Sequence, residues 1–334
     1  MIQYLIIQLC DTSTSYCHYN NCNKVSKLIS IEDLKAGIIL AMKENLMIQF
    51  VYPDEELTEE YKKIINSIDH NDIVSSLCKD KELVTSADVV VLHDWTALQY
   101  FQFSKTQSYV LRTSKDDFFD RHIMLKTVLP KAKRFNVVFT DMESFGEDDY
   151  ERYRKILGFL SDEVSNAFCE GNHVQCNLLT DRLELSVMNN CDAGWKNITL
   201  APNGEFYICP AFYIDKASSV GDVYKGINIP NPQLYRLDYA PICLHCDSYQ
   251  CKRCVWLNKK TTLEVNTPSH QQCVIAHLER NASRKLMENP KVVSTLKEPS
   301  EINEIDYLDP FDRRDKWDYE AMQKELIKFH KENY

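Results

Sequence analysis

The first half of the chain alternates short apolar runs with amphipathic stretches, and this alternation limits the folds open to it. Apolar runs typical of strands lie at 4–9, 47–52, 87–92, 108–112 and 136–140. Helical patterns lie between them at 34–42, 57–68, 118–128 and 150–160, the first preceded by an N-cap signal at Ser30 and Asp33. The order predicts an α/β fold with a parallel sheet, either a partial (β/α) barrel or a flat doubly wound sheet.

Glycine is scarce, with 8 residues in 334, and Gly37 alone precedes Gly146. Loops that cradle phosphates need several glycines, because the backbone must approach the ligand closely. The first 145 residues therefore contain no Rossmann, Walker or kinase glycine loop, and this favours the barrel. The net charge of −10 argues against a general nucleic-acid binder, which needs a basic surface.

The composition, with 44% hydrophobic and 26% charged residues, is that of an ordinary globular protein. No run approaches the roughly 20 apolar residues of a membrane span. The apolar start, residues 1–9, lacks a basic region and a cleavage site, so we interpret it as a buried strand rather than a signal peptide. We expect a cytoplasmic protein with no membrane partner. Its 13 cysteines then indicate metal binding or catalysis rather than disulfides.

The texture of the sequence changes near residue 180, where strands shorten and cysteines become dense. A turn signal, Pro202–Asn203–Gly204, also appears there. We predict three regions: a barrel over 1–180, a small cysteine-rich α+β domain over 181–285, and a helical tail over 286–334 that packs on the body.

Seven cysteines follow a regular order in the middle region. Cys191 is followed after twelve residues by Gly204 and after four more by Cys209; then come Cys243, Cys246, Cys251 and Cys254, spaced two, four and two residues apart, and finally Cys273. Zinc ribbons place a longer arm between their pairs, and His245 stands at no regular ligand spacing. Dense thiolates without interleaved histidines favour iron–sulfur clusters. A structural zinc module remains the alternative.

This order resembles the SPASM domain, the seven-cysteine extension that follows radical SAM barrels in peptide-modifying enzymes. The resemblance implies two auxiliary 4Fe-4S clusters, one held by Cys243, Cys246, Cys251 and Cys273 and the other by Cys191, Cys209 and Cys254. A fourth ligand for the second cluster would come from upstream, where Cys176 and Cys169 are the candidates, or the site would stay open for substrate.

A radical SAM barrel carries three cysteines after its first strand, and here that motif has degenerated. Residues 10–22 read C-D-T-S-T-S-Y-C-H-Y-N-N-C, so the three ligand positions become Ser13, Cys17 and Asn20. Cys10 and Cys22 flank the loop at other spacings. The Gly-Gly-Glu segment that receives the cofactor's amino group is also missing at 51–57. The resemblance implies S-adenosylmethionine and a third cluster bound through Cys17, and these losses argue against both.

The segments D-T-S-T-S-Y-C-H-Y-N and K-E-N-L-M-I-Q-F-V-Y-P, with the SPASM-like end, resemble the CXXX-repeat peptide maturases. Their resemblance implies maturation of a ribosomally synthesised cysteine-repeat precursor peptide, by thioether formation or another modification at cysteine with a cluster as electron acceptor. One alternative is a non-catalytic, peptide-binding scaffold that partners a companion modifying enzyme. Another is a zinc-binding interaction protein.

Polar residues that follow the predicted barrel strands are further site candidates, since catalytic groups gather at strand ends in such barrels. They are Asp11, His93, Asp94, Arg112, Asp141 and Glu143. The simpler interpretation is that they cap the helices that follow.

Overall fold

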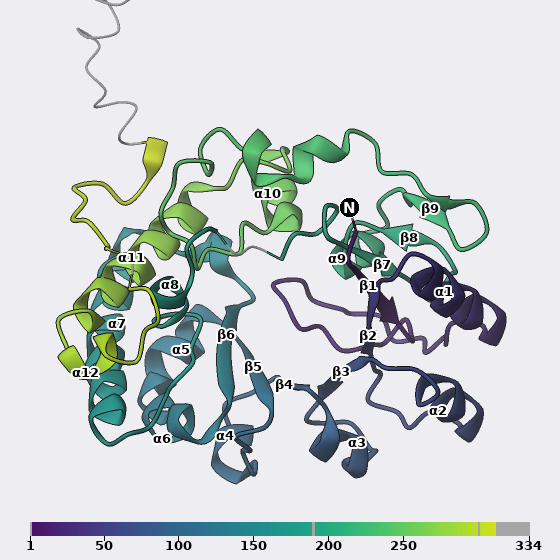
Figure 1. The fold of residues 1–334 in the computed structure, drawn as a ribbon, viewed down its shortest axis with the longest axis horizontal. Coiled ribbons are helices and arrows are strands. Elements are labelled where there is room, and N and C mark those ends of the chain that lie inside the picture. The colour runs from purple at the N-terminus through teal and green to yellow at the C-terminus, as the bar shows by residue number, and fades with distance from the viewer. Residues whose placement is uncertain (1, 189–190, 300, 312–334) are drawn as a thin grey trace, which may run out of the picture.

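The computed structural model describes residues 2–188, 191–299 and 301–311, and an eight-stranded sheet organises it (Figure 1). The strands are β1 (Tyr4–Gln8), β2 (Met47–Val51), β3 (Asn71–Ser75), β4 (Val89–Leu92), β5 (Ser108–Thr113), β6 (Arg134–Phe139), β7 (Asn197–Leu200) and β8 (Phe206–Tyr207), with a separate pair, β9 (Gly221–Asp222) and β10 (Gly226–Ile227). The large sheet has the order β6-β5-β4-β3-β2-β1-β7-β8.

Helices connect the strands and cover the outer side of the sheet. The α-helices are α1 (Ile31–Lys43), α2 (Glu59–Ile65), α3 (Lys81–Ser86), α4 (Ala97–Tyr100), α5 (Lys115–Arg121), α6 (Leu125–Val128), α7 (Glu147–Cys169), α8 (Asp181–Glu184), α9 (Pro210–Ile214), α10 (Val255–Thr262), α11 (His270–Leu286) and α12 (Pro290–Val293). Short 3-10 helices are η1 (His122–Met124), η2 (Leu129–Lys131), η3 (Met142–Ser144), η4 (Pro232–Tyr235) and η5 (Leu237–Tyr239).

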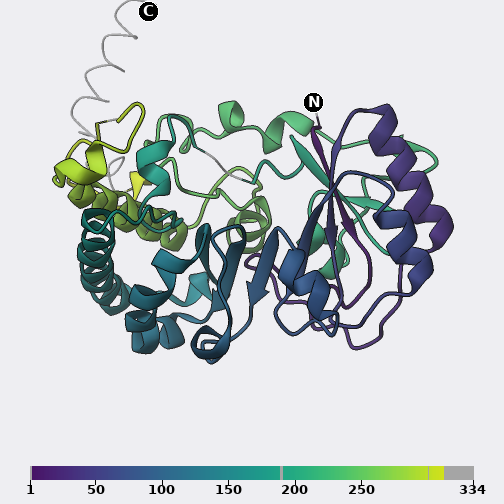
Figure 2. The same cartoon turned by 60° about the horizontal axis from the view of Figure 1, so that its bottom comes forward.

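The first six strands confirm the predicted fold class. Neighbours from β1 to β6 are parallel and follow chain order, with registers such as Leu5↔Ile48 and Val110↔Asn136. The sheet forms an open arc with helices α1 to α7 outside it, and the loop after β1 lies on the inner side (Figures 1 and 2). This is a partial (β/α) barrel, whose concave face is free to hold a site.

Two local predictions differ from the structure. Strand β3 and helix α3 were not predicted, because β3 opens with Asn71 and Asp72 and keeps only two apolar residues, Ile73 and Val74. The single helix expected over 118–128 is divided into α5, η1 and α6, because Arg121 leaves the helical region with φ −121° and ψ 0°. Phe118 and Leu125, on either side of the division, are both buried in the core.

The cysteine-rich segment joins the barrel's own sheet. Strand β7 pairs with β1 in parallel, and the predicted turn at Pro202–Asn203–Gly204 connects β7 to antiparallel β8. Gly204 has φ +79°, and a Cβ there would lie 2.9 Å from the Asp33 carboxyl group, so glycine suits both the turn and the contact. The hairpin is therefore fixed relative to β1, and the segment that follows it covers the mouth of the arc.

The C-terminal region packs on the barrel through α11, which lies along α7. The Ser161 hydroxyl on α7 reaches the Ala282 carbonyl oxygen on α11 at 3.3 Å, and α12 follows against the end of α7. The helix predicted up to Tyr334 lies outside the described residues.

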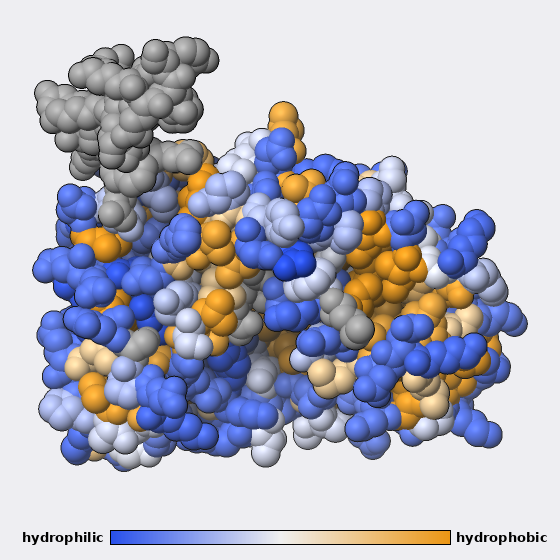
Figure 3. All heavy atoms as spheres, turned by 45° about the horizontal axis from the view of Figure 1, so that its top comes forward, coloured by the Kyte–Doolittle hydropathy of each residue, from blue (hydrophilic) through white to orange (hydrophobic). Residues whose placement is uncertain are grey.

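Figure 3 shows apolar side chains gathered on the side of the molecule that carries α1. Ile39 and Met42 on α1 and Met47 at the start of β2 are each at least half exposed. Exposed apolar side chains that gather in this way are candidates for contact with another molecule. None of the described helices has both the length and the apolar content that crossing a membrane requires.

Candidate metal centre

The loop after β1 is closed by hydrogen bonds at two of the expected ligand positions. The Ser13 hydroxyl donates to the Val51 carbonyl oxygen at 2.8 Å and accepts from the Cys10 amide at 3.0 Å. The Asn20 side-chain oxygen accepts from Arg112 at 2.6 Å. Both side chains are thus used to hold the loop against the barrel rather than being available to a ligand.

Arg112, at the end of β5, is the main anchor of this loop. Besides Asn20, its guanidinium donates to the carbonyl oxygens of Tyr19 and, at 2.9 Å, of Cys17. Burial lowers the pKa of Arg112, but an arginine keeps its charge at any ordinary pH. His18 adds a second anchor, with Nδ1 at 2.7 Å from the Phe139 carbonyl oxygen. Loop residues 17–20 are therefore held at the carboxyl ends of β5 and β6.

The flanking cysteines of the loop have different environments. Cys10 is buried, and its sulfur lies 3.2 Å from the Thr12 hydroxyl and 3.1 Å from the Ser26 hydroxyl. Cys22 is exposed.

The segment that would carry the Gly-Gly-Glu motif is hydrogen-bonded to the loop after β1. There the Tyr52 carbonyl oxygen accepts from the Thr14 amide at 2.9 Å, so this backbone is also occupied by the loop.

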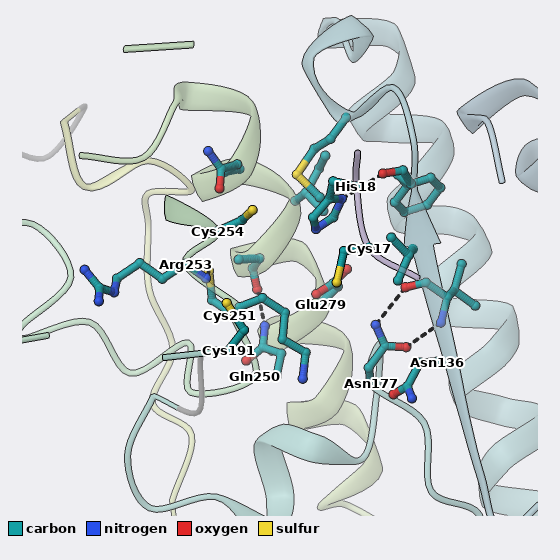
Figure 4. Close-up of a pocket in the computed structure, with 18 of the residues that line it drawn as sticks. Cys17, His18, Asn136, Asn177, Cys191, Gln250, Cys251, Arg253, Cys254 and Glu279 are labelled. Carbon is teal, nitrogen blue, oxygen red and sulfur yellow. Dashed lines mark hydrogen bonds between the residues drawn. The ribbon is translucent and has the colours of Figure 1, made fainter. Parts of the chain in front are cut away.

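Two adjoining cavities, of about 290 and 410 Å³, open between the barrel and the cysteine-rich segment. Their linings share Tyr16, Cys17, His18, Cys191 and Cys254. Cys209 also lines the larger cavity, so Cys17 and three of the SPASM-like cysteines all line that cavity. Figure 4 shows Cys17, Cys191 and Cys254 around the smaller cavity, each coming from a different part of the chain.

The electrostatics of this group favour bound cations. Burial raises the pKa of the Cys17 thiol, and the neighbouring Cys191 and Cys254 raise it further. The same causes, burial first and then Cys254 and Cys191, raise the pKa of Cys209 well above its ordinary value. Crowded thiols become thiolates once metal ions offset their charge. The donor set suits a soft metal centre.

The other four cysteines form a second group. Cys243, Cys246, Cys251 and Cys273 line one small cavity together with His277. The His277 Nε2 atom lies 3.7 Å from the Cys246 sulfur. Burial raises the pKa of Cys246, but the hydrogen bond and charge of His277 outweigh this and leave the pKa below its ordinary value.

His277 is a site residue that the sequence analysis missed. Its signal was present: Cys273 and His277 are four residues apart, so on a helix such as α11 they lie on one face. His245, the histidine weighed instead, does not line this cavity among the described residues. Over residues 2–188, 191–299 and 301–311, no three His, Cys, Asp or Glu side chains converge as ligands of a single metal ion.

Arg253 is a buried charge with unused donors beside both cysteine groups. Its side chain is 2% exposed, and one guanidinium nitrogen donates to the Tyr235 carbonyl oxygen. Its Nε and Nη1 atoms have no hydrogen-bond partner within the described part of the chain. Burial raises the pKa of both Cys243 and Cys191, and the charge of the Arg253 guanidinium partly opposes each shift, so it lies near both groups. A buried cation of this kind needs anionic partners.

Glu279 is a second residue missed by the sequence analysis. It lines the smaller cavity, and its carboxylate accepts from the Tyr153 hydroxyl at 2.8 Å. Burial raises its pKa to about 8. A carboxyl group with such a pKa can hold or release a proton near neutral pH.

The polar residues at the barrel's strand ends serve mainly as structural anchors. Asp94 caps α4 by accepting from the Ala97 amide at 2.9 Å, and Asp141 accepts from the Lys115 amide at 3.0 Å. Asp11, His93 and Glu143 pair instead with Tyr213, Thr14 and Lys260. Helix capping thus accounts for Asp94, and longer-range contacts account for the others.

No protein-family model matches the chain, and neither does any curated protein. Solved structures do match. A hexahistidine-tagged anSMEcpe with bound AdoMet is 15% identical with a TM-score of 0.58, and the match covers 87% of this chain and 99% of that one. Native anSMEcpe with bound AdoMet and Cp18Cys peptide is 14% identical with a TM-score of 0.56, over 88% of this chain and 99% of that one.

These neighbours are radical SAM/SPASM enzymes, specifically anaerobic sulfatase-maturating enzymes. The chain therefore has the radical SAM/SPASM fold, and the resemblance noted from its cysteine pattern is confirmed at the level of the fold. The match extends through the cysteine-rich half as well as the barrel, since it covers most of both chains.

Proposed function

We propose that this protein is an iron–sulfur protein of precursor-peptide maturation that does not itself cleave S-adenosylmethionine. One observation carries the proposal: Ser13 and Asn20, the substituted ligand positions, are both used in hydrogen bonds that close the loop after β1. A radical SAM cluster needs three thiolates there, and Cys17 supplies one. The chain therefore keeps the radical SAM fold, and its redox groups would lie in the cysteine-rich segment, residues 181–285.

The two cysteine groups are the proposed sites of two 4Fe-4S clusters. Cys243, Cys246, Cys251 and Cys273 would hold one, and Cys191, Cys209 and Cys254 would contribute to the other. Their grouping around two cavities supports this assignment. So does Arg253, because a cluster with thiolate ligands carries negative charge and would offer the buried guanidinium the partner it lacks. Such clusters supply electron transfer or structural cross-linking.

A peptide is the proposed substrate or cargo. The anSMEcpe enzyme is crystallised with a peptide, and in this chain the smaller cavity presents Asn136, Lys252 and Glu279. Amide, ammonium and carboxyl groups of this kind can pair with peptide N–H and C=O groups. We propose that the peptide is a ribosomally synthesised cysteine-repeat precursor, as in the CXXX-repeat maturases, and that a companion enzyme modifies it in the cytoplasm.

Anaerobic reconstitution tests the proposal. We expect about eight irons and eight sulfides per chain, counting four per cluster, and no 5′-deoxyadenosine when dithionite and S-adenosylmethionine are added. About twelve irons with cofactor cleavage would instead identify a catalytic radical enzyme. Stoichiometric zinc without iron or sulfide would contradict both.

The peptide part has its own measurement. Fluorescence anisotropy with a labelled cysteine-repeat peptide should show saturable binding. A variant peptide with serine at every cysteine is measured in the same way for comparison. Absence of binding to either peptide, with both clusters present, would contradict the peptide assignment and leave the iron–sulfur assignment standing.

A further inference from the structure

We propose that Cys17 is the fourth thiolate ligand of the cluster held by Cys191, Cys209 and Cys254. The inference rests on the proposed function, because it assumes that a cluster occupies this site. It gives a role to the one thiol that survives at the three ligand positions Ser13, Cys17 and Asn20. The sequence left two possibilities for this cluster: a fourth ligand from upstream, or one iron left open for substrate. The assignment of Cys17 replaces both.

Position is the first argument. Cys17 lines both of the adjoining cavities, as do Cys191 and Cys254. Cys209 completes the set in the larger cavity. The four thiols thus line the larger cavity from four separate segments: the loop after β1, the approach to β7, the end of β8 and the start of α10.

Rigidity is the second argument. The Cys17 carbonyl oxygen accepts from Arg112 at 2.9 Å, and the next residue, His18, is fixed to the Phe139 carbonyl oxygen. On the other side, the rings of Tyr16 and Tyr19 meet edge to face with their centroids 6.1 Å apart. The Cys17 backbone is therefore held in place before any metal binds, which is what a ligand position requires.

The upstream candidates do not reach the site. Cys176 is buried beside β6, where its backbone forms an isolated parallel β-bridge with Phe135. It lines neither cavity within the described residues. Cys169 ends helix α7, is exposed, and its sulfur accepts from the Asn289 amide group at 3.6 Å. Neither of these thiols shares the space that Cys191 and Cys254 enclose.

Charge is the third argument. Arg112 lies behind Cys17, Lys252 lines the smaller cavity, and Arg253 is buried nearby with two unused donors. Four thiolates around an iron–sulfur core make an anionic group, which these cations would offset.

The consequence concerns what the cluster can do. With four thiolates every iron is coordinated by protein, so the cluster has no open iron for a substrate. It would transfer electrons or act as a cross-link, and it would join the barrel loop to the cysteine-rich half across more than 170 residues of sequence.

The test compares Cys17→Ser with Cys22→Ser, a matched control in the same loop whose cysteine is exposed. Both full-length proteins are reconstituted anaerobically, and iron, sulfide and the EPR spectrum of the dithionite-reduced state are measured. We expect Cys22→Ser to match the unaltered protein. We expect Cys17→Ser to lose about one to four irons and to change the EPR signal of one cluster only.

A second measurement on the unaltered protein avoids dependence on how the variant folds. Imidazole is titrated into the reduced protein, and EPR reports whether it coordinates iron. Full thiolate coordination predicts an unchanged spectrum, and the Cys17→Ser variant should respond. A response in the unaltered protein, or a Cys17→Ser spectrum and iron content like those of Cys22→Ser, would overturn the assignment. An unaltered protein without iron and sulfide would instead contradict the proposed function.

Discussion

Arg112 Nη2 lies 2.6 Å from the Asn20 side-chain oxygen, so an arginine at the end of β5 holds the position where a cluster ligand would stand in a radical SAM enzyme. The two residues are 92 positions apart, and the bond is partly buried. The Arg112 guanidinium donates here to oxygen acceptors, namely the Asn20 side chain and the carbonyl groups of Cys17 and Tyr19. The loop is therefore a folded element with its own anchor.

Replacing Arg112 should destabilise the protein substantially. Arg112→Met leaves the Cys17 and Tyr19 carbonyl oxygens and Asn20 without their charged donor, and hydrogen bonds to charged groups contribute roughly 1.5–3 kcal/mol each. We expect the free energy of unfolding in urea to fall by about 3 kcal/mol. Arg121→Met is the control: its ion pair with Asp117 is exposed, and its loss should cost below about 0.5 kcal/mol. Equal losses in the two variants would show that the anchor has no special role.

Two glycines in helices should respond in opposite ways to alanine. A Cβ at Gly37 would lie 2.4 Å from a methyl carbon of buried Leu200 on β7, whereas at Gly158 on α7 nothing lies within 4 Å. Gly158→Ala should raise the free energy of unfolding by up to about 1 kcal/mol through helix propensity. Gly37→Ala should lower it by about 1–2 kcal/mol, because overpacking outweighs that gain. Thermal unfolding measures both changes. Stabilisation by both substitutions would contradict the prediction, because it would mean that there is room for a methyl group between α1 and β7.

Stability should decrease between about pH 5 and pH 8 because of Glu279. Its folded pKa of about 8 lies above the ordinary value of 4.5, so the folded protein binds more protons than the unfolded chain in this window. The free energy of unfolding therefore falls as pH rises through it. Glu279→Gln removes this titration and should flatten the dependence. Urea unfolding at several pH values measures the slope, with the exposed Glu288→Gln as control; an unchanged slope in Glu279→Gln would refute the assignment.

Removing the metal should loosen the cysteine-rich half selectively. Residues 240–254 contain turns but no helix or strand, and the apolar cluster there has only Met188, Ala240 and Cys243 as buried members. Metal–thiolate bonds would thus provide much of the order in this segment. Hydrogen exchange of reconstituted and iron-depleted protein should show faster exchange at 240–254 after depletion and little change in β1 to β6. Equal exchange rates at 240–254 in the reconstituted and the iron-depleted protein would contradict a structural role for the clusters.

Much of the fold is encoded locally and could be predicted. Apolar runs at β1, β2 and β4 to β6 have the length and composition of buried parallel strands, and the turn at Gly204 has its own signature. Strand β3 was missed because three of its five residues are polar and its apolar signal is too short. The loss of two ligand positions at Ser13 and Asn20 was also visible in the sequence, since it is a matter of residue identity and spacing.

The tertiary structure decided which distant residues meet. The resemblance to the SPASM domain divided the cysteines into two groups, but no sequence pattern indicated that Cys17 would lie beside Cys191 and Cys254, that Glu279 would line the same cavity, or that Arg253 would be buried nearby. These contacts depend on β7 pairing with β1 and on α11 packing along α7, which join segments more than 100 residues apart. Periodicity records how a segment meets its own neighbours in the chain, whereas contacts between segments are set by how their faces pack together.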